Sequence, residues 1–334
     1  MSIIKFIMAA RCEAAGRPNN EDNFQLTDNL ADDQWSFVTD SEVELSEKGA
    51  LLIVCDGMGG ANAGEVASQL AVETVKEWFS SERLTEEVLA NSESITRYIK
   101  KAIVAADLRI KEEGKADKNK EGMGTTIVLA WVIGQSVFVG WCGDSRAYCF
   151  HPATGLQRFS HDHSFVQSLV DMGQLSDELA FNHPNGNIIT RSLGDPLQEA
   201  QPEVKEYPLH NDDVIMLCSD GLNGVLRDSA IEEVMRENAE NMSACRDALW
   251  EAARNANWYD NVTIGLCRIV TGGSEQDANP PATPTEMSTE TPTETPTPPQ
   301  EPAKKGKWKS IACLVVGLIL GILAGIVIAK HFNF

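Results

Sequence analysis

The chain has 334 residues, of which 43% are hydrophobic, which is enough for one large or two ordinary domains built around a core. Its 49 acidic and 28 basic residues give a net charge of −21. This balance argues against nucleic acid as a partner, because contacts with a phosphate backbone need clustered Lys and Arg. A phosphorylated substrate would need divalent cations that reverse the local field, although a solvated surface and an acidic linker explain part of the charge.

The 8 cysteines include no C-x-x-C pair, and most stand alone within apolar runs. They are predicted to be reduced and buried in a cytosolic compartment, without disulfides or a zinc site. The apolar N-terminal run is short and is broken by Lys5, so it is predicted to be a first strand and not a signal peptide.

Hydrophobic periodicity predicts the regular elements, and the helical stripes indicate core packing without chemistry. Strands are expected at Ile3–Ala10, Ala50–Cys55, Thr125–Trp131, Ser136–Cys142, Arg146–Phe150, Asp213–Cys218 and directly from Asp260 onward; helices are expected at Gly64–Phe79, Ser94–Glu113, Phe165–Met172, Ser229–Asn238 and Ser243–Asn257. The polar stretch Thr27–Lys48 is expected to form a hairpin or an excursion.

Acidic residues recur where strands end. Asp56 follows the buried strand Ala50–Cys55 and is followed by glycines, which allow the backbone to approach whatever the acid holds. An ordinary Asp-Gly turn explains this stretch equally well when it is taken alone. Similar acids occur at Glu21, Asp22, Asp220 and Asp260, and Asp144 lies in a turn that also fits an Asx-type turn.

Ligand sets made only of oxygen atoms suit Mg²⁺ or Mn²⁺. Two such ions that share a water would make it a nucleophile at neutral pH, and Arg17 is a candidate phosphate ligand, with a surface arginine as the alternative. The combination indicates hydrolysis of a phosphate ester by in-line attack of water. No G-x-x-x-x-G-K-[ST] loop and no nucleophilic cysteine motif is present.

Two histidines, His161 and His163, flank Asp162 just before a predicted helix. No further His or Cys completes the spacing of a zinc motif. Helix capping and surface chemistry are therefore favoured over a zinc site.

The C-terminal part changes in composition. Residues 271–303 are rich in Pro, Thr and Glu and predict a disordered linker, which is followed by a basic segment at 304–310. The uncharged apolar run 311–329 is long enough to span a bilayer, and the flanking lysines predict a single-pass anchor with the preceding domain on the cytoplasmic face of the cell membrane. A buried soluble helix is the disfavoured alternative. Gly317, Gly321 and Gly325 permit a homodimer in the membrane, although glycine is common in such helices.

Eight short motifs occur in an order that resembles the metal-dependent Ser/Thr protein phosphatases of type 2C in their bacterial form. They are Arg17-x-x-x-Glu21-Asp22, Asp56-Gly57-x-Gly59-Gly60, Gly122-x-Gly124-Thr125-Thr126, Gly143-Asp144-Ser145-Arg146, Asp162-His163-Ser164, Ile189-Thr190-Arg191-x-Leu193-Gly194, Ser219-Asp220-Gly221-Leu222 and Asp260-Asn261-x-Thr263. The resemblance covers about residues 1–270, which would form the catalytic domain.

The resemblance implies an α+β fold, a four-layer αββα sandwich of two antiparallel sheets flanked by helices. It also implies phosphoserine and phosphothreonine proteins as substrates. Transferred residue by residue, Asp56 would bridge two ions, Asp220 and Asp260 would hold the first, and Glu21 and the Gly57 carbonyl would hold the second. Asp22 and Asn261 would support these ligands, Asp144 with Asp220 would hold a third, weaker ion, Arg17 would grip the phosphate, and residues 169–187 would form a mobile flap.

One departure concerns Met58, which stands where some members of the family have a histidine proposed as general acid. Methionine cannot donate a proton, and none of His161, His163 or His183 is assigned this role. The leading hypothesis is an active phosphatase that opposes a membrane Ser/Thr kinase. The alternatives are a non-catalytic phosphoprotein-binding module and a phosphatase of small phosphoesters. The complete set of acids disfavours the non-catalytic module.

Overall fold

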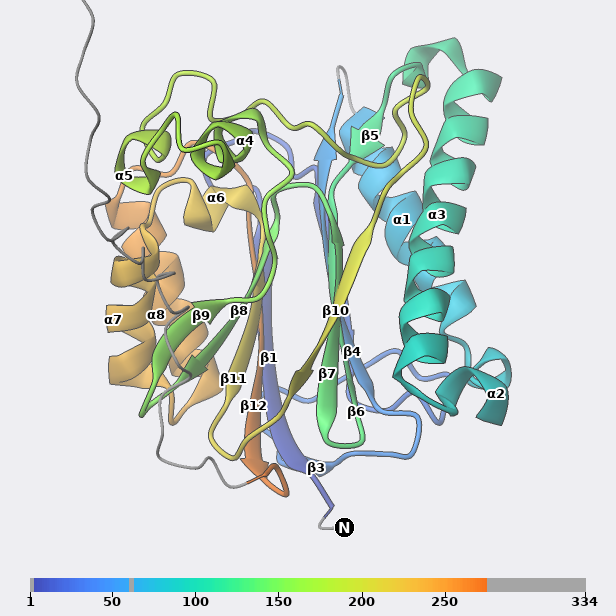
Figure 1. Cartoon of the computed structure of the whole chain (residues 1–334), viewed down its shortest axis with the longest axis vertical. Coiled ribbons are helices and arrows are strands. Elements are labelled where there is room, and N and C mark those ends of the chain that lie inside the picture. The colour runs from blue at the N-terminus through green and yellow to red at the C-terminus, as the bar shows by residue number, and fades with distance from the viewer. Residues whose placement is uncertain (1–2, 60–62, 275–334) are drawn as a thin grey trace, which may run out of the picture. The chain divides into compact units, whose positions relative to one another are not determined.

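The computed structural model describes residues 3–59 and 63–274, which fold as two β-sheets stacked face to face between two layers of helices (Figure 1). The first sheet has the strand order β3-β1-β12-β11-β8-β9, and the second has the order β10-β7-β6-β4-β2, with β5 paired to β4. All of these strand pairs are antiparallel. The predicted α+β sandwich of two antiparallel sheets flanked by helices is therefore confirmed.

The first sheet combines strands from the beginning, the middle and the end of the described residues. They are β1 (Lys5–Glu13), β3 (Val43–Glu44), β8 (Arg146–His151), β9 (Gly155–Arg158), β11 (Val214–Cys218) and β12 (Val262–Thr271). Those of the second sheet are β2 (Asp22–Thr27), β4 (Ala50–Met58), β5 (Gly124–Thr125), β6 (Ile127–Ile133), β7 (Ser136–Cys142) and β10 (Glu203–Pro208).

Helices cover the outer face of each sheet (Figure 1). The second sheet packs against α1 (Ala63–Trp78) and α3 (Ser92–Ala116), and the first packs against α7 (Asp228–Asn238) and α8 (Met242–Asn255). Shorter helices are α2 (Glu86–Leu89), α4 (Phe165–Asp171), α5 (Asp177–Ala180) and α6 (Asp220–Asn223), with 3₁₀ turns at Ser81–Arg83 and Lys118–Lys120.

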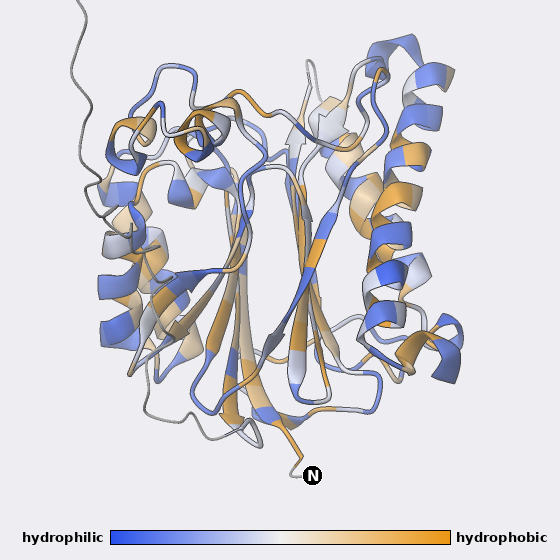
Figure 2. Cartoon of the chain, viewed as in Figure 1, coloured by the Kyte–Doolittle hydropathy of each residue, from blue (hydrophilic) through white to orange (hydrophobic). Residues whose placement is uncertain are grey.

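Strand β4 shows how one apolar run serves two cores. Because side chains alternate across a strand, Leu51 and Ile53 pack toward α1 and α3, whereas Leu52 and Val54 pack between the sheets. Both faces of the strand are buried, and its sequence is accordingly apolar without alternation. Figure 2 shows the same concentration of hydrophobic residues along the strands of both sheets.

Several predicted boundaries differ from the structure. Strand β4 continues to Met58, so Asp56 and Gly57 lie within its pairing with β2 and β5, and the interpretation of this stretch as an ordinary turn is wrong. The final strand begins at Val262, two residues after Asp260. Residues 27–48 form an irregular excursion in which only β3 is regular. Strands β9 and β10 were not predicted, because these edge strands are only partly buried and carry little apolar alternation.

The cysteines of the described residues are all free, and all of them except Cys12 are buried, as expected. No helix within residues 3–59 and 63–274 is both long enough and apolar enough to cross a membrane. The predicted linker, basic segment and membrane span lie outside the described residues, as do Gly317, Gly321 and Gly325.

Candidate metal centre and active site

Asp56 lies at the end of β4 and continues the series Leu52, Val54 that faces the space between the sheets. Its backbone is fixed on both sides. The Asp56 N–H donates to Thr126 Oγ1 at 3.1 Å, and the Asp56 carbonyl accepts from Thr125 Oγ1 and from the Thr126 N–H at 2.8 Å each. The sheet thus presents one carboxylate from a rigid backbone.

Asp22 is the residue directly opposite Asp56 in the pairing of β2 with β4, so the two carboxyl groups share one face. Asp22 Oδ2 accepts hydrogen bonds of 2.7 Å from both Ser219 Oγ and Thr263 Oγ1. Ser219 follows β11 and Thr263 lies on β12, so this buried carboxyl joins the ends of the two sheets.

Three more predicted acids lie in segments next to the strand ends, at the same end of the sheets. Asp144 lies in the turn between β7 and β8, Asp220 opens α6 immediately beyond β11, and Asp260 precedes β12. All three line one cavity of 1430 Å³ together with Arg17. Close approach is needed here, since a Cβ on Gly221 would lie 1.9 Å from the Asn261 carbonyl oxygen.

Three buried carboxylate oxygens of this group have no hydrogen-bond partner within the described residues: Asp22 Oδ1, Asp144 Oδ1 and Asp220 Oδ1. Burial raises the pKa of Asp22 to about 7 and that of Asp220 to about 6. The pKa of Asp56 lies well above its usual range because of burial and then because of the charges of Asp22, Asp220 and Asp144. Carboxylates crowded in this way favour a cation.

Glu21 and Gly57 lie against each other at the edge of the cluster. The Gly57 N–H donates to the Glu21 carbonyl at 3.2 Å, and the Glu21 N–H donates to Asn261 Oδ1 at 2.8 Å. A Cβ on Gly57 would lie 2.2 Å from the Gly64 carbonyl oxygen, so this position requires glycine. Asn261 therefore holds the backbone of a predicted ligand, which is consistent with its expected supporting role.

No group of three or more His, Cys, Asp or Glu side chains in residues 3–59 and 63–274 has the spacing of a ready metal site. The donor set nevertheless fits a hard cation, because the buried side-chain oxygens that lack partners in the described part of the chain are all carboxylate oxygens. Asp56, Asp22, Asp144 and Asp220 also influence one another electrostatically. The predicted metal-ligand roles of these residues remain predictions.

Arg17 reaches the cavity, as predicted, but its guanidinium is already engaged. Arg17 Nη2 donates to Asp260 Oδ2 at 2.7 Å, while 53% of the Arg17 side chain stays exposed. The hydrogen bond with Asp260, followed by the charge of Asp260, raises the pKa of Arg17. A phosphate ligand and the Asp260 carboxylate would therefore compete for this side chain.

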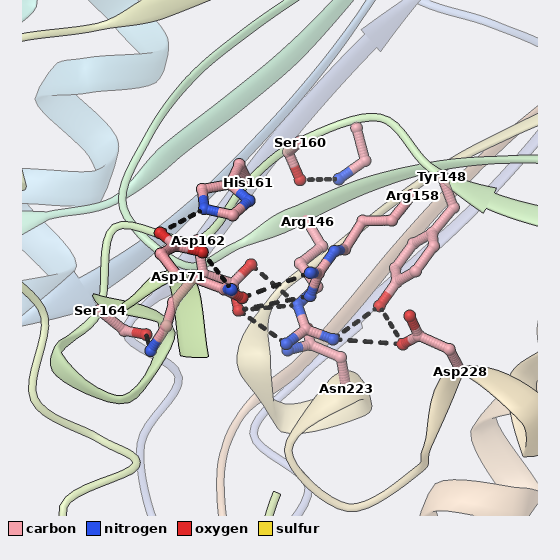
Figure 3. Close-up of polar contacts among 12 residues, drawn as sticks. Arg146, Tyr148, Arg158, Ser160, His161, Asp162, Ser164, Asp171, Asn223 and Asp228 are labelled. Atoms are coloured by element: carbon pink, nitrogen blue, oxygen red, sulfur yellow. Dashed lines mark hydrogen bonds and ion pairs between the residues drawn. The ribbon is translucent and has the colours of Figure 1, made fainter. Parts of the chain in front are cut away.

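Arg146 is the centre of a polar network that no sequence pattern predicted (Figure 3). Arg146 Nε and Nη2 donate to Asp162 Oδ2 at 3.0 and 2.6 Å, and Nη1 donates to Tyr148 and to Asp228 Oδ1 at 3.0 and 3.2 Å. The network ties β8 to the loop before α4 and to the start of α7. The Gly143–Arg146 motif contained the residue, but only the fold revealed its partners.

The histidines of the Asp162 motif have different surroundings. His163 is buried; its Nδ1 accepts from the Gly143 N–H at 3.1 Å and its Nε2 lies 3.1 Å from Glu203 Oε1. Burial lowers the pKa of His163. The expected surface or capping role is therefore wrong for His163, since Ser164 caps α4; the half-exposed His161 pairs instead with Asp171 at 2.9 Å.

Comparison with known proteins identifies the family. Residues 27–258 match the family model described as Protein phosphatase 2C. The chain belongs to this family. It is an enzyme of the serine/threonine phosphatase class, and the resemblance inferred from the motifs is confirmed at the level of the family. The matched residues do not include Arg17, Glu21, Asp22 or Asp260.

Individual relatives agree with the family. The serine/threonine phosphatase stp of Listeria welshimeri is 33% identical over 218 residues, which are 65% of this chain and 83% of that protein. Stp1 of Staphylococcus aureus has a solved structure with 30% identity and a TM-score of 0.66, covering 79% of this chain and 95% of that one. The catalytic domain of PstP, solved in complex with two manganese ions, is 28% identical with a TM-score of 0.63, covering 80% of this chain and all of that one.

Proposed function

We propose that this type 2C phosphatase removes phosphate from phosphoserine and phosphothreonine in proteins and uses two Mn²⁺ or Mg²⁺ ions. The observation that carries the proposal is the set of three buried carboxylate oxygens at one end of the sandwich that lack a partner among the described residues. A structure of the relative PstP contains two manganese ions, which supports the same chemistry here.

In this proposal, Asp56 would hold both ions, Asp220 and Asp260 would hold the first, and Glu21 with the Gly57 carbonyl would hold the second. Asp144 and Asp220 are assigned to a third, weaker site. Asn261 would hold Glu21 through its bond to the Glu21 N–H, and Asp22 would support the site through its bonds to Thr263 and to Ser219, the neighbour of Asp220. The bound ions would activate a water for in-line attack and would neutralise the charge on the phosphate.

The chain's own residues bind and orient the substrate. The Arg17 guanidinium, more than half exposed at the cavity, would take phosphate oxygens in place of the Asp260 carboxylate that it now binds. The cavity continues under α4 and α5 and reaches Lys205 and Tyr207 on β10, which leaves room for residues that flank the phosphorylated side chain.

Phosphate release from a phosphothreonine peptide by the full chain tests the proposal. Release should require Mn²⁺ or Mg²⁺, stop with EDTA, and be lost in Asp56→Asn and Asp220→Asn. A folded protein that binds Mn²⁺ but leaves the peptide intact would contradict it. A parallel assay with a small phosphoester then separates a small-molecule phosphatase from a non-catalytic phosphoprotein-binding module.

We also propose that the enzyme is tethered to the cytoplasmic face of the cell membrane by residues 311–329 and opposes a membrane Ser/Thr kinase. The support is the uncharged apolar run behind basic residues 304–310, because a tether raises the effective concentration toward membrane partners. The full chain should stay with membranes in high salt, and a chain without residues 304–334 should become soluble. Equal fractionation of the two would contradict the anchor.

The anchor would also allow a homodimer through the small residues Gly317, Gly321 and Gly325. Gly321→Ile should then reduce chemical cross-linking between two differently tagged copies in membranes. Unchanged cross-linking would contradict this interface.

A further inference from the structure

Asp107 on α3 is a buried carboxylate on the outer helix layer of the second sheet. Its side chain is 0% exposed. Asp107 Oδ1 accepts from the Gly194 N–H at 2.8 Å, while Oδ2 accepts from the Ala200 N–H at 3.1 Å and from Lys111 Nζ at 2.7 Å. Burial of a charge is costly unless it is paired and hydrogen-bonded, and both oxygens meet that condition here.

The hydrogen bonds of Asp107 hold the segment 193–200 tightly against α3. Gly194 has a φ of +90°, and a Cβ at this position would lie 2.5 Å from the Met123 carbonyl oxygen and 2.7 Å from Ile110 Cγ2. Lys111 adds a further bond from the same helix to the Gln198 carbonyl. Glycine allows this close approach, and the carboxylate satisfies the amides that it buries.

Thr125 connects this segment to the backbone of Asp56. Leu193, the neighbour of Gly194, exchanges two hydrogen bonds with Thr125: the Thr125 N–H donates to the Leu193 carbonyl at 3.1 Å, and the Leu193 N–H donates to the Thr125 carbonyl at 2.9 Å. Thr125 Oγ1 then donates to the Asp56 carbonyl at 2.8 Å. Three contacts therefore connect a helix outside the site to the backbone of Asp56, the residue to which the proposed function assigns both ions.

The segment also completes the return of the chain from α4 and α5, which cover the cavity. Ile189 pairs with Ser164, and the Thr190 N–H donates to the His163 carbonyl at 2.8 Å. Asp107 binds the chain further along, at Gly194 and Ala200. Loss of its acceptor oxygens would therefore release residues 193–200, while the pairing of residues 189–190 near α4 persists.

We propose that Asp107 is a positioning residue, which fixes the segment 193–200 and, through Leu193 and Thr125, the backbone from which Asp56 acts. The role rests on the proposed function, because it matters for activity only if Asp56 holds the catalytic ions. Asp107 itself does not touch substrate; its effect is on the geometry of another residue.

Asp107→Asn tests the proposal with little change in volume, because the amide offers one acceptor oxygen where the carboxylate offers two. Lys111→Met is a matched variant that removes the ion pair and the bond to the Gln198 carbonyl but keeps both backbone contacts of Asp107. Ile103→Val, in the buried core of α3, serves as a control for general destabilisation. All are compared with the unaltered full chain well below their unfolding temperatures.

Asp107→Asn should lower kcat about tenfold and raise the Mn²⁺ concentration for half-maximal activity severalfold, with the KM for a phosphothreonine peptide within about twofold, since supporting residues of metal sites typically have effects of this size. Amide hydrogen exchange should accelerate at residues 193–200 and at Thr125. The Lys111→Met and Ile103→Val variants should keep kcat within about twofold. Equal kinetics in Asp107→Asn and Ile103→Val, despite faster exchange, would show a merely structural role and overturn the proposal.

Two further measurements keep the outcome decisive. If Asp107→Asn does not fold, Thr125→Val tests the far end of the connection by removing the hydroxyl that holds the Asp56 carbonyl, and Thr125→Ser should restore activity; full activity in Thr125→Val would overturn the proposal. If the unaltered chain releases no phosphate, the proposed function fails separately. Calorimetric Mn²⁺ binding then decides, and equal affinities in the unaltered chain and Asp107→Asn would contradict the positioning role.

Discussion

Asp22 is a single residue in which hydrogen bonds favour the charged carboxylate and burial disfavours it. Its Oδ2 is held by hydroxyls from the end of β11 and from β12, whereas its Oδ1 has no partner in the described residues. Two hydroxyl donors favour the ionised form, but burial outweighs them and raises the pKa to about 7. The residue therefore resists ionisation until positive charge is nearby.

The raised pKa of Asp22 predicts a pH dependence of the metal-free protein. The folded pKa lies above the unfolded value of about 4, so the folded state binds more protons between these values and loses stability as pH rises. From about pH 4 to 7, unfolding free energy should fall relative to that of Asp22→Asn by up to about 1.4 kcal/mol per pH unit. Denaturant titrations across this range in EDTA would measure the difference, and parallel pH profiles for the two proteins would contradict the prediction.

Arg17 should not be replaceable by lysine. Its planar guanidinium can give two hydrogen bonds to a phosphate, whereas an ammonium group acts as a point charge. Arg17→Lys should lower kcat/KM for a phosphothreonine peptide by about 10- to 100-fold, the equivalent of one charge-assisted hydrogen bond. Circular dichroism and Mn²⁺ binding serve as controls, and unimpaired kcat/KM would show that phosphate binds elsewhere.

At the scale of elements, loops after the strands are held by a few buried polar groups. Arg146 on β8 bonds to Asp162 ahead of α4 and to Asp228 at the first residue of α7 (Figure 3). The side chains of Arg146 and Asp162 are only 17% and 8% exposed, so the pair is buried. Removal of one partner would leave an uncompensated charge in the interior.

Arg146→Met should accordingly lower the free energy of unfolding by about 3–5 kcal/mol. The double variant Arg146→Met/Asp162→Leu should recover part of the lost free energy of unfolding, because it also removes the Asp162 carboxylate that the single variant leaves without Arg146. Denaturant unfolding of the single and double variants measures the coupling. Equal stability of Arg146→Met and the unaltered protein would mean that this buried pair contributes nothing to the fold.

For the whole molecule, the two sheets converge at one end, where their acids collect into a negative centre. A cation bound there stabilises the folded state by mass action, by about 2.7 kcal/mol when its concentration is 100 times the Kd. Mn²⁺ should therefore raise the unfolding temperature, and Asp56→Asn should reduce the rise. Thermal scans with Mn²⁺ and with EDTA measure this without any substrate, and unfolding that is insensitive to the metal would contradict a cation site.

The order of motifs predicted the family, and the resemblance to that family implied the fold class. Hydrophobic periodicity predicted most of the main elements, because buried apolar runs and helical stripes carry a local signal. The sequence also predicted which acids collect at one end, through their recurrence after strands. The edge strands β9 and β10 were not predicted, and Asp56 and Gly57 were predicted to lie beyond the strand that in fact contains them. Those features depend on pairing with distant strands, which no local pattern encodes.

The sequence by itself determined that an apolar strand leads directly into Asp56 and Gly57, since this order is local. Only the tertiary structure decided that Asp22 faces Asp56 in register, that Arg17 binds Asp260, and that Asp107 supports the segment beside Thr125. His163 illustrates the same limit, because its burial against Gly143 depends on a turn 20 residues earlier in the chain. The physical reason is that burial and hydrogen-bond partners are properties of packed surfaces, and these form only when distant segments meet.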